Sequence, residues 1–249
     1  MSHVEDAQSP HSGVQWFATT HWSVVLTAAR HAEPQAAEAL EQLCRSYWYP
    51  LYAYVRKTGR TVEDSQDLTQ DFFARLLEKQ YLGLATPERG RFRTFLLSSL
   101  KNFLANDWNR ARRQKRGGQV VFLSIDADVG ENLYAAEPVE TADPEKLYEK
   151  RWAGTLLDLT LNRLREDYAA SGRAQLFDEL KVYVWGERSD ASYSEVAAHL
   201  QLSEGAVKVA VHRLRQRFRD LLRAEIANTV ADAREVDEEL RHLIAVIAS

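Results

Sequence analysis

Residues 192–218 read SYSEVAAHLQLSEGAVKVAVHRLRQRF, two short helical patterns on either side of a break. Ser203 stands directly before the second pattern, where its side-chain oxygen can cap a helix, and Glu204 follows at the end that the helix dipole makes positive. Leu202 is expected to fill the turn. In the second pattern the apolar residues recur at intervals of three and four, as a buried helical stripe does, at Val207, Val211, Leu214, Phe218 and Leu221. The stretch predicts a helix-turn-helix.

The face opposite that stripe is polar and basic, with Lys208, His212, Arg213 and Arg215. A helix with one buried stripe and a basic outer face fits the major groove of DNA. His212 lies between Lys208 and Arg215, which favours contact with DNA over metal binding. The alternative is a structural helical hairpin whose outer face is only solvated.

The basic helix belongs to one of two positive blocks in a chain whose formal net charge is only −4. Residues 89–118 hold nine bases and one acid, a net charge of +8, and residues 205–223 hold six bases and one acid, a net charge of +5. Residues 119–149 hold eight acids and one base (−7), and residues 224–249 hold six acids and two bases (−4). Two basic blocks joined by an acidic stretch suggest two polyanion-binding surfaces on a tether.

Apolar periodicity predicts helices along the rest of the chain. We expect them at about 21–30, 40–58 and 63–79, from Phe92 into the basic block, and at 145–168, 171–186, 192–201 and 204–227. Pro50 should kink or split the second of these. Residues 1–18 and the segment from 226 onward are expected to be tails, and VVFLSI (120–125) is a strand-like run within a linker. The expected fold class is all-α, with two small helical domains joined by an acidic linker.

The composition also excludes several classes of protein. Cys44 is the single cysteine, which rules out an internal disulfide and a cysteine-clustered zinc site. No apolar run approaches the roughly 18 residues of a membrane helix, and the acidic N-terminus lacks the apolar segment of a signal peptide. We therefore expect a cytoplasmic protein without membrane contact. Phosphate-binding loops, nucleophile elbows, dinucleotide turns and metal-ligand motifs do not occur, so we expect no enzyme, no catalytic residues, no metal and no cofactor.

Three segments resemble the bacterial sigma-70 family of RNA polymerase sigma factors, in particular its extracytoplasmic-function (ECF) group. LSEGAVKVAVHR (202–213) is similar to the region 4 recognition helix, EDSQDLTQDFFARLL (63–77) to region 2.2, and KNFLANDWNRARRQKR (101–116) to regions 2.3 and 2.4. Residues 119–148 leave no room for a folded region 3, which fits the ECF group. The chain departs from the usual motifs at Gln66, where Glu is common, at Gln201, where Gly is common, and at Val209-Ala210, where Ser-Arg is common.

The resemblance implies a division of the chain and a set of partners. The division is an N-terminal extension (1–35), a region 2 domain for core polymerase and the −10 element (36–118), an acidic linker (119–148), a region 4 helix-turn-helix for the −35 element (149–225) and a C-terminal tail (226–249). The partners are core RNA polymerase, through its β′ clamp and β flap, and promoter DNA.

The resemblance also assigns roles to residues, and their chemistry agrees. Acids on one helix face suit a basic partner, and the residues assigned to core polymerase are Asp64, Asp67, Leu68, Gln70, Asp71 and Phe73. Arginine neutralises phosphates, asparagine reads base edges and aromatic rings stack on unpaired bases. The residues assigned to the −10 element are Arg93, Lys101, Asn102, Asn106, Trp108, Asn109, Arg110, Arg112 and Arg113. Those assigned to the −35 element are Ser203, Glu204, Gly205, Lys208, Val209, His212, Arg213 and Arg215.

The expected function is that of a sigma factor, which binds core RNA polymerase, directs it to specific promoters and assists promoter opening. One alternative is a helix-turn-helix repressor or activator that does not replace a sigma factor. Another is a helical nuclease, against which the lack of a metal-ligand cluster speaks. An anti-sigma factor or a Ser/Thr kinase is a candidate regulatory partner. A kinase could act on Thr61, Ser65 or Thr69, where a phosphate would add about −1.5 to −2 charges beside Gln66.

Overall fold

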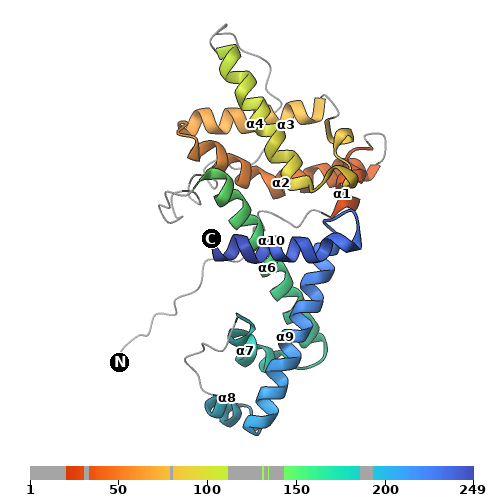
Figure 1. The fold of residues 1–249 in the computed structure, drawn as a ribbon, viewed down its shortest axis with the longest axis vertical. Helices are drawn as coiled ribbons and strands as arrows, with labels where there is room; N and C mark the ends of the chain where they lie inside the picture. The colour runs from red at the N-terminus through yellow and green to blue at the C-terminus, as the bar shows by residue number, and fades with distance from the viewer. Residues whose placement is uncertain are drawn as a thin grey trace.

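The computed structural model describes residues 21–30, 34–78, 81–111, 131, 134, 143–185 and 193–249. Within these residues all regular elements are helical, which confirms the all-α class (Figure 1). The first half contains α1 (Trp22–Ala28), α2 (Pro34–Lys57), α3 (Val62–Glu78), η1 (Tyr81–Leu84), η2 (Pro87–Arg89) and α4 (Phe92–Ala111). The second half contains α6 (Pro144–Ala170), α7 (Ala174–Leu180), η3 (Lys181–Trp185), α8 (Tyr193–His199), α9 (Glu204–Ala227), η4 (Ala233–Glu235) and α10 (Val236–Ala248). The tail at 1–18 and the strand-like run at 120–125 lie outside the described residues.

The long helix α2 is the centre of the first half and packs against α1, α3 and α6. Its side chains from 43 to 55 are almost all buried, because they are mostly large apolar and aromatic groups that the neighbouring helices cover. Trp48 stacks on Tyr52 with 5.0 Å between the ring centroids. The helix continues through Pro50, where we expected a kink or a split. The N-terminal helix α1 buries Trp22 and Val25 against this core and so adds to it.

Helix α6 joins the two halves. Asp143 caps its first turn, where the carboxylate accepts a hydrogen bond from the backbone N–H of Glu145 at 2.9 Å. From there α6 runs out of the upper body, where it packs against α2, into the lower arm, where it packs against α7 and α9 (Figure 1). Tyr148, Trp152 and Leu156 are buried along it, and the buried side chains of both halves form one continuous cluster.

The helix-turn-helix forms the end of the lower arm, where α8 and α9 meet (Figure 1). Ser203 caps α9 as predicted, since its hydroxyl oxygen accepts a hydrogen bond from the N–H of Ala206 at 3.2 Å. The predicted stripe is buried except for Leu221, which is half-buried, while Leu222 beside it is buried. The expectation that Leu202 fills the turn is wrong, because its side chain is 43% exposed. The backbone closes the turn instead, with the N–H of Leu202 donating to the carbonyl of Ala197 at 2.9 Å.

The turn holds Gln201 in the left-handed region, with φ of 55°. A residue with a Cβ is disfavoured there by roughly 1–2 kcal/mol, whereas glycine is not. We expect Gln201→Gly to raise the free energy of unfolding by about 0.5–1 kcal/mol, because the added freedom of the unfolded chain offsets part of the relief. Urea unfolding followed by circular dichroism measures this. Ala198→Gly, at an exposed helical position of α8, is the control and should lower stability by about 1 kcal/mol. An equal loss for Gln201→Gly would contradict the expectation.

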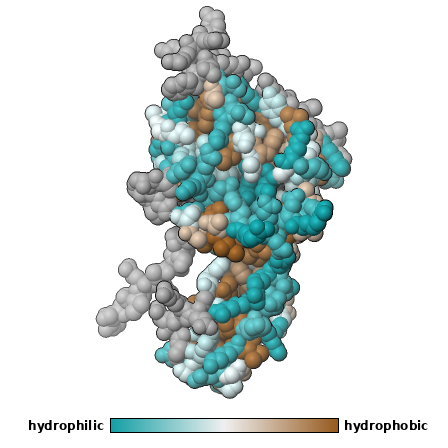
Figure 2. Space-filling view, in the orientation of Figure 1, coloured by the Kyte–Doolittle hydropathy of each residue, from teal (hydrophilic) through white to brown (hydrophobic). Residues whose placement is uncertain are grey.

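The segment from 226 onward, expected to be a tail, contains a packed helix. Helix α10 lies across the middle of the molecule and packs against α6 and α9, burying Val236, Leu243 and Val246 (Figure 1). The N-terminal helix reaches the turn that precedes α10, since the indole N–H of Trp22 donates to the carbonyl of Thr229 at 3.2 Å. Figure 2 shows apolar surface in this middle region, and Ile244 on the outer side of α10 is 64% exposed.

Candidate nucleic-acid and polymerase interfaces

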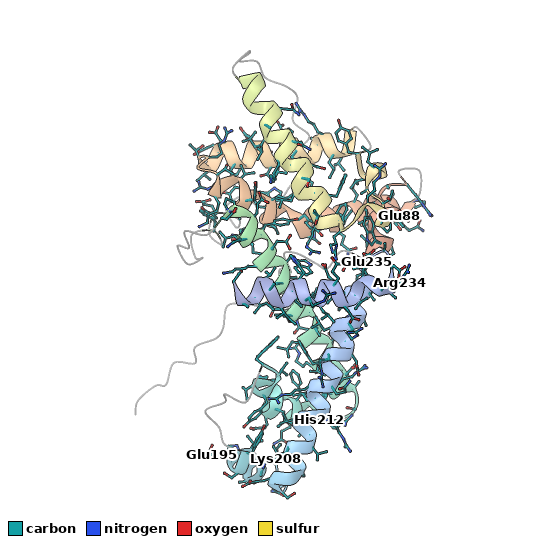
Figure 3. The ribbon with its side chains drawn as sticks, viewed as in Figure 1. Glu88, Glu195, Lys208, His212, Arg234 and Glu235 are labelled. Atoms are coloured by element: carbon teal, nitrogen blue, oxygen red, sulfur yellow. The ribbon has the colours of Figure 1, made fainter. Side chains whose placement is uncertain are left out.

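The outer face of α9 carries most of the residues predicted to contact the −35 element. Lys208 and His212 lie one helical turn apart on α9, near the end of the arm (Figure 3). They are exposed together with Ser203, Glu204, Gly205, Val209 and Arg213. Val209, 51% exposed among basic neighbours, suits contact with a thymine methyl group. The face therefore offers positive charge and one apolar contact on a rigid helix that is anchored by its buried stripe.

Two other basic residues of α9 hold the arm together. Arg215 is half-buried and its Nε donates to the carbonyl of Tyr183 in η3 at 2.8 Å, so part of its guanidinium is committed to the protein. Arg217 donates from Nε to the carboxylate of Asp167 on α6 at 2.8 Å. Of the eight residues predicted for this face, Arg215 donates to η3, and Lys208 has its ammonium 5.9 Å from the centroid of the Tyr193 ring on α8.

The acidic face predicted on α3 is present. Asp64, Asp67 and Asp71 are exposed, and Gln70 is half-buried beside them. Leu68 and Phe73, which were predicted to contact the polymerase, are 8% and 1% exposed and belong to the core. They fix the orientation of the helix and leave its acids as the groups that a basic partner can reach.

The hydroxyl groups near Gln66 differ in accessibility. Thr61 is exposed and caps α3, since its Oγ1 accepts a hydrogen bond from the N–H of Asp64 at 3.1 Å. Ser65 and Thr69 are fully buried, and their hydroxyls donate to the backbone carbonyls of Thr61 and Ser65, each at 2.7 Å. A kinase could reach neither buried hydroxyl without opening the helix bundle, so Thr61 is the accessible site of the three.

The exposed polar residues of α4 include Asn102 and Asn106, as predicted. Lys101 is engaged by the second half of the chain, because its ammonium donates to the carboxylate of Glu145 on α6 at 2.6 Å. That hydrogen bond, and the charge of Glu145, raise the pKa of Lys101 above its usual value. The side chains predicted at Trp108, Asn109 and Arg110, and residues 112 and 113, lie outside the described residues.

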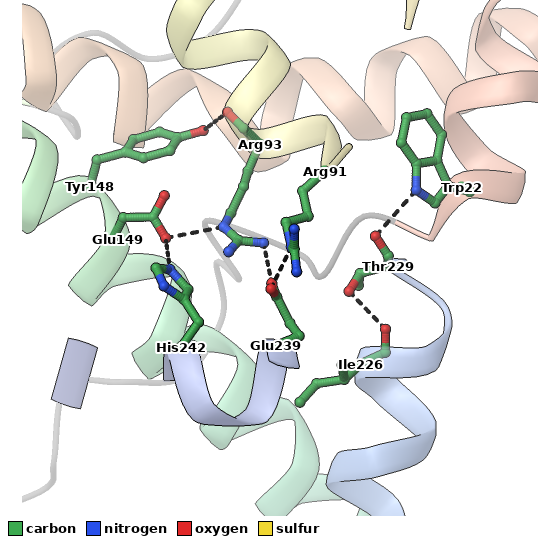
Figure 4. A network of polar contacts seen from close by, with 9 residues as sticks. All are labelled: Trp22, Arg91, Arg93, Tyr148, Glu149, Ile226, Thr229, Glu239 and His242. Carbon is green, nitrogen blue, oxygen red and sulfur yellow. Dashed lines mark hydrogen bonds and ion pairs between the residues drawn. The ribbon is translucent and has the colours of Figure 1, made fainter. Parts of the chain in front are cut away.

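Arg93, also predicted to contact DNA, is 4% exposed and sits in a network of charges between α4, α6 and α10 (Figure 4). Its Nη1 lies 2.5 Å from the carboxylate of Glu239, and its Nε donates to Glu149 at 3.1 Å. Arg91 also donates to Glu239, and His242 lies 3.0 Å from Glu149. Burial lowers the pKa of Arg93, but the two carboxylates outweigh it and hold the pKa above its usual value.

The acidic half of this network was not predicted from the sequence. Glu239 is 1% exposed although it lies in a segment expected to be a tail. The available signal was the net charge of that segment, which is opposite in sign to the block containing Arg91 and Arg93. A charge count gives the sign of a partner but does not indicate which residues pair.

The described part of the chain lacks two further features. It contains no group of three or more His, Cys, Asp or Glu side chains placed to hold a metal ion. No helix in the same residues is long and apolar enough to span a membrane.

Comparison with known proteins points to one family. The chain is 23% identical over 198 residues to the ECF RNA polymerase sigma factor SigE of Mycolicibacterium smegmatis, a match that covers 80% of this chain and 67% of that protein. No protein-family profile matches the chain, and no solved structure matches it. The similarity is distant, and it agrees with the family that the motifs resemble.

Proposed function

We propose that the chain is a sigma factor of the ECF type, which binds core RNA polymerase, directs it to a set of promoters and assists promoter opening. The observation that carries the proposal is the extent of the distant similarity. A match of 198 residues in a chain of 249 cannot be confined to residues 149–225, so it also includes much of the first half. A relative that shared only a helix-turn-helix would not match in this way, and this disfavours a simple repressor or activator.

The proposal divides the work between surfaces on different parts of the molecule. The acids of α3 face the polymerase, the exposed face of α4 binds the −10 region, and the outer face of α9 reads the −35 element. Residues 36–118 and 149–225 serve as the two functional regions, and the acidic segment 119–148 connects them. The nucleotidyl-transfer chemistry belongs to the polymerase, so no catalytic residue is required of this chain, which acts in the cytoplasm.

Reversing the acidic face should weaken binding to core polymerase. Asp64→Arg with Asp67→Arg replaces attraction by repulsion at two exposed positions. We expect an association about 10- to 100-fold weaker, with a difference that shrinks as salt is raised. Analytical gel filtration with bacterial core enzyme and a fluorescent label on this chain measures the affinity.

The matched control is Glu38→Arg with Glu166→Arg, which changes the net charge equally at exposed helical positions outside the predicted faces. This control should bind core enzyme as the wild type does. If the two double variants bind equally well, α3 is not the polymerase-binding face. If the wild-type chain does not bind core enzyme at all, the proposed function fails.

A further inference from the structure

Three basic residues near or on α4 are occupied by carboxylates of the second half. Arg91 and Arg93 contact Glu239 of α10, Arg93 also contacts Glu149 of α6, and Lys101 contacts Glu145 of α6. All three bases come from the block with a net charge of +8. A carboxylate offers arginine the same paired oxygen acceptors as a phosphate does. The contacts therefore place protein carboxylates where phosphate oxygens of a nucleic acid would bind.

Arg93 is buried where α10 and α6 meet, whereas Lys101 remains accessible. Glu239 is 1% exposed and Arg93 is 4% exposed, whereas Lys101 and Glu145 are each nearly half exposed. The guanidinium of Arg93 also lies over the ring of Trp152 on α6, 3.7 Å from its centroid. Release of Glu239 would remove one of the two carboxylates that hold Arg93, the other being Glu149 on α6.

Helix α10 packs on the molecule through one face, and its opposite face is exposed. Leu243 anchors it at 2% exposure, whereas Ile244, the next residue, is 64% exposed. In the turn that precedes α10, Asn228 and Ala231 are exposed, whereas Thr229 and Val230 are buried and the indole N–H of Trp22 donates to the carbonyl of Thr229. Separation of the helix would break the contacts of Glu239 with Arg91 and Arg93, of Asp237 with Arg223 and of His242 with Glu149.

We propose that α10 is an intramolecular cap that occupies the basic surface at the start of α4 and must leave before that surface binds nucleic acid. The inference rests on the proposed function, because it takes the α4 surface to be a DNA-binding one. The described structure is then the closed form of the protein. Binding of DNA and retention of α10 are alternatives, since both use the side chains of Arg91 and Arg93.

Two pairs of variants test the cap. Glu239→Gln removes the buried charge, and Glu238→Gln removes the same charge from its exposed neighbour. Leu243→Ala loosens the anchor without changing charge, and Ile244→Ala makes a similar truncation on the exposed side.

The probe is a fluorescein-labelled single-stranded 20-mer of random sequence, titrated by fluorescence anisotropy. Hydrogen exchange of the peptide covering 236–248 reports opening of α10 without any ligand, and circular dichroism confirms that each variant is folded.

We expect Glu239→Gln and Leu243→Ala each to bind the oligonucleotide about tenfold more tightly than its control, within the range typical of coupled sites. The same two variants should exchange faster in α10. Equal affinity within both pairs would overturn the cap, even if exchange differs, because α10 would then hide no nucleic-acid surface. If the wild type and all variants fail to bind both the oligonucleotide and core enzyme, the proposed function fails. If core binding persists while the pairs remain equal, only the cap fails.

Discussion

Replacing Arg93 by Ala is expected to lower the free energy of unfolding by about 3–5 kcal/mol, the usual loss when one partner of a buried ion pair is removed. The loss is large because Glu239 is 1% exposed and would keep only Arg91 as a cationic partner in the space between α4, α6 and α10. Truncation also removes the packing of the guanidinium against Trp152. Urea unfolding, followed by tryptophan fluorescence and circular dichroism together, measures the change.

A second substitution separates the effect of charge from that of packing. The unpaired carboxylate of Glu239 is the expected cause of the lost stability. The double variant Arg93→Ala with Glu239→Gln should then be no less stable than Arg93→Ala alone, since the second change removes the uncompensated charge. Additive losses from the two substitutions would show that their contact is unimportant. A loss below about 1 kcal/mol for Arg93→Ala would contradict the buried network itself.

Replacing Lys208 and Arg213 by Ala together is expected to weaken binding to duplex DNA by about 10- to 100-fold. Both side chains are exposed on the outer face of α9, and a lost base contact there costs about 1–3 kcal/mol. The probe is a duplex selected by the wild-type chain from random-sequence DNA, and binding is measured by anisotropy at fixed salt.

The control for this pair is Arg45→Ala with Arg165→Ala, which removes two exposed positive charges away from the outer face of α9. Its effect should be small and should vanish at high salt. A base-reading residue also relaxes sequence preference when it is removed, whereas a phosphate contact does not. Repeating the selection with each single variant shows which role Lys208 and Arg213 have. Equal losses for the two double variants would mean that α9 does not read DNA through this face.

Local signals in the sequence were sufficient to predict α9. Ser203 caps α9 and the predicted range of 204–227 matches the observed helix, because capping and apolar periodicity act within a few residues. Gln201, at a position where related motifs often have Gly, proves to be left-handed. The glycine that is common at this position of the family motif thus indicated the left-handed backbone, which a glutamine alone does not suggest.

Long-range pairing could not be read from the sequence. Arg93 and Glu239 lie far apart in the chain, and no local pattern indicates that they meet in a buried network. Leu68 and Phe73 belong to a motif that was assigned to polymerase binding. They are nevertheless buried in the core, because neighbouring helices cover that side of α3. The segregated charge blocks suggested two binding surfaces on a tether, and the structure shows that several of these opposite charges meet within the molecule.

The most direct test of the sigma-factor proposal is transcription by core RNA polymerase that has been freed of its own sigma factors. Core enzyme from the native host would be incubated with genomic DNA fragments and nucleotides, with and without this chain, and the transcripts sequenced from their 5′ ends. We predict discrete start sites that appear only with the chain and are lost with Lys208→Ala and Arg213→Ala. A transcript population that is the same with and without the chain, including with the Glu239→Gln variant in which α10 is expected to be released, would contradict the proposal.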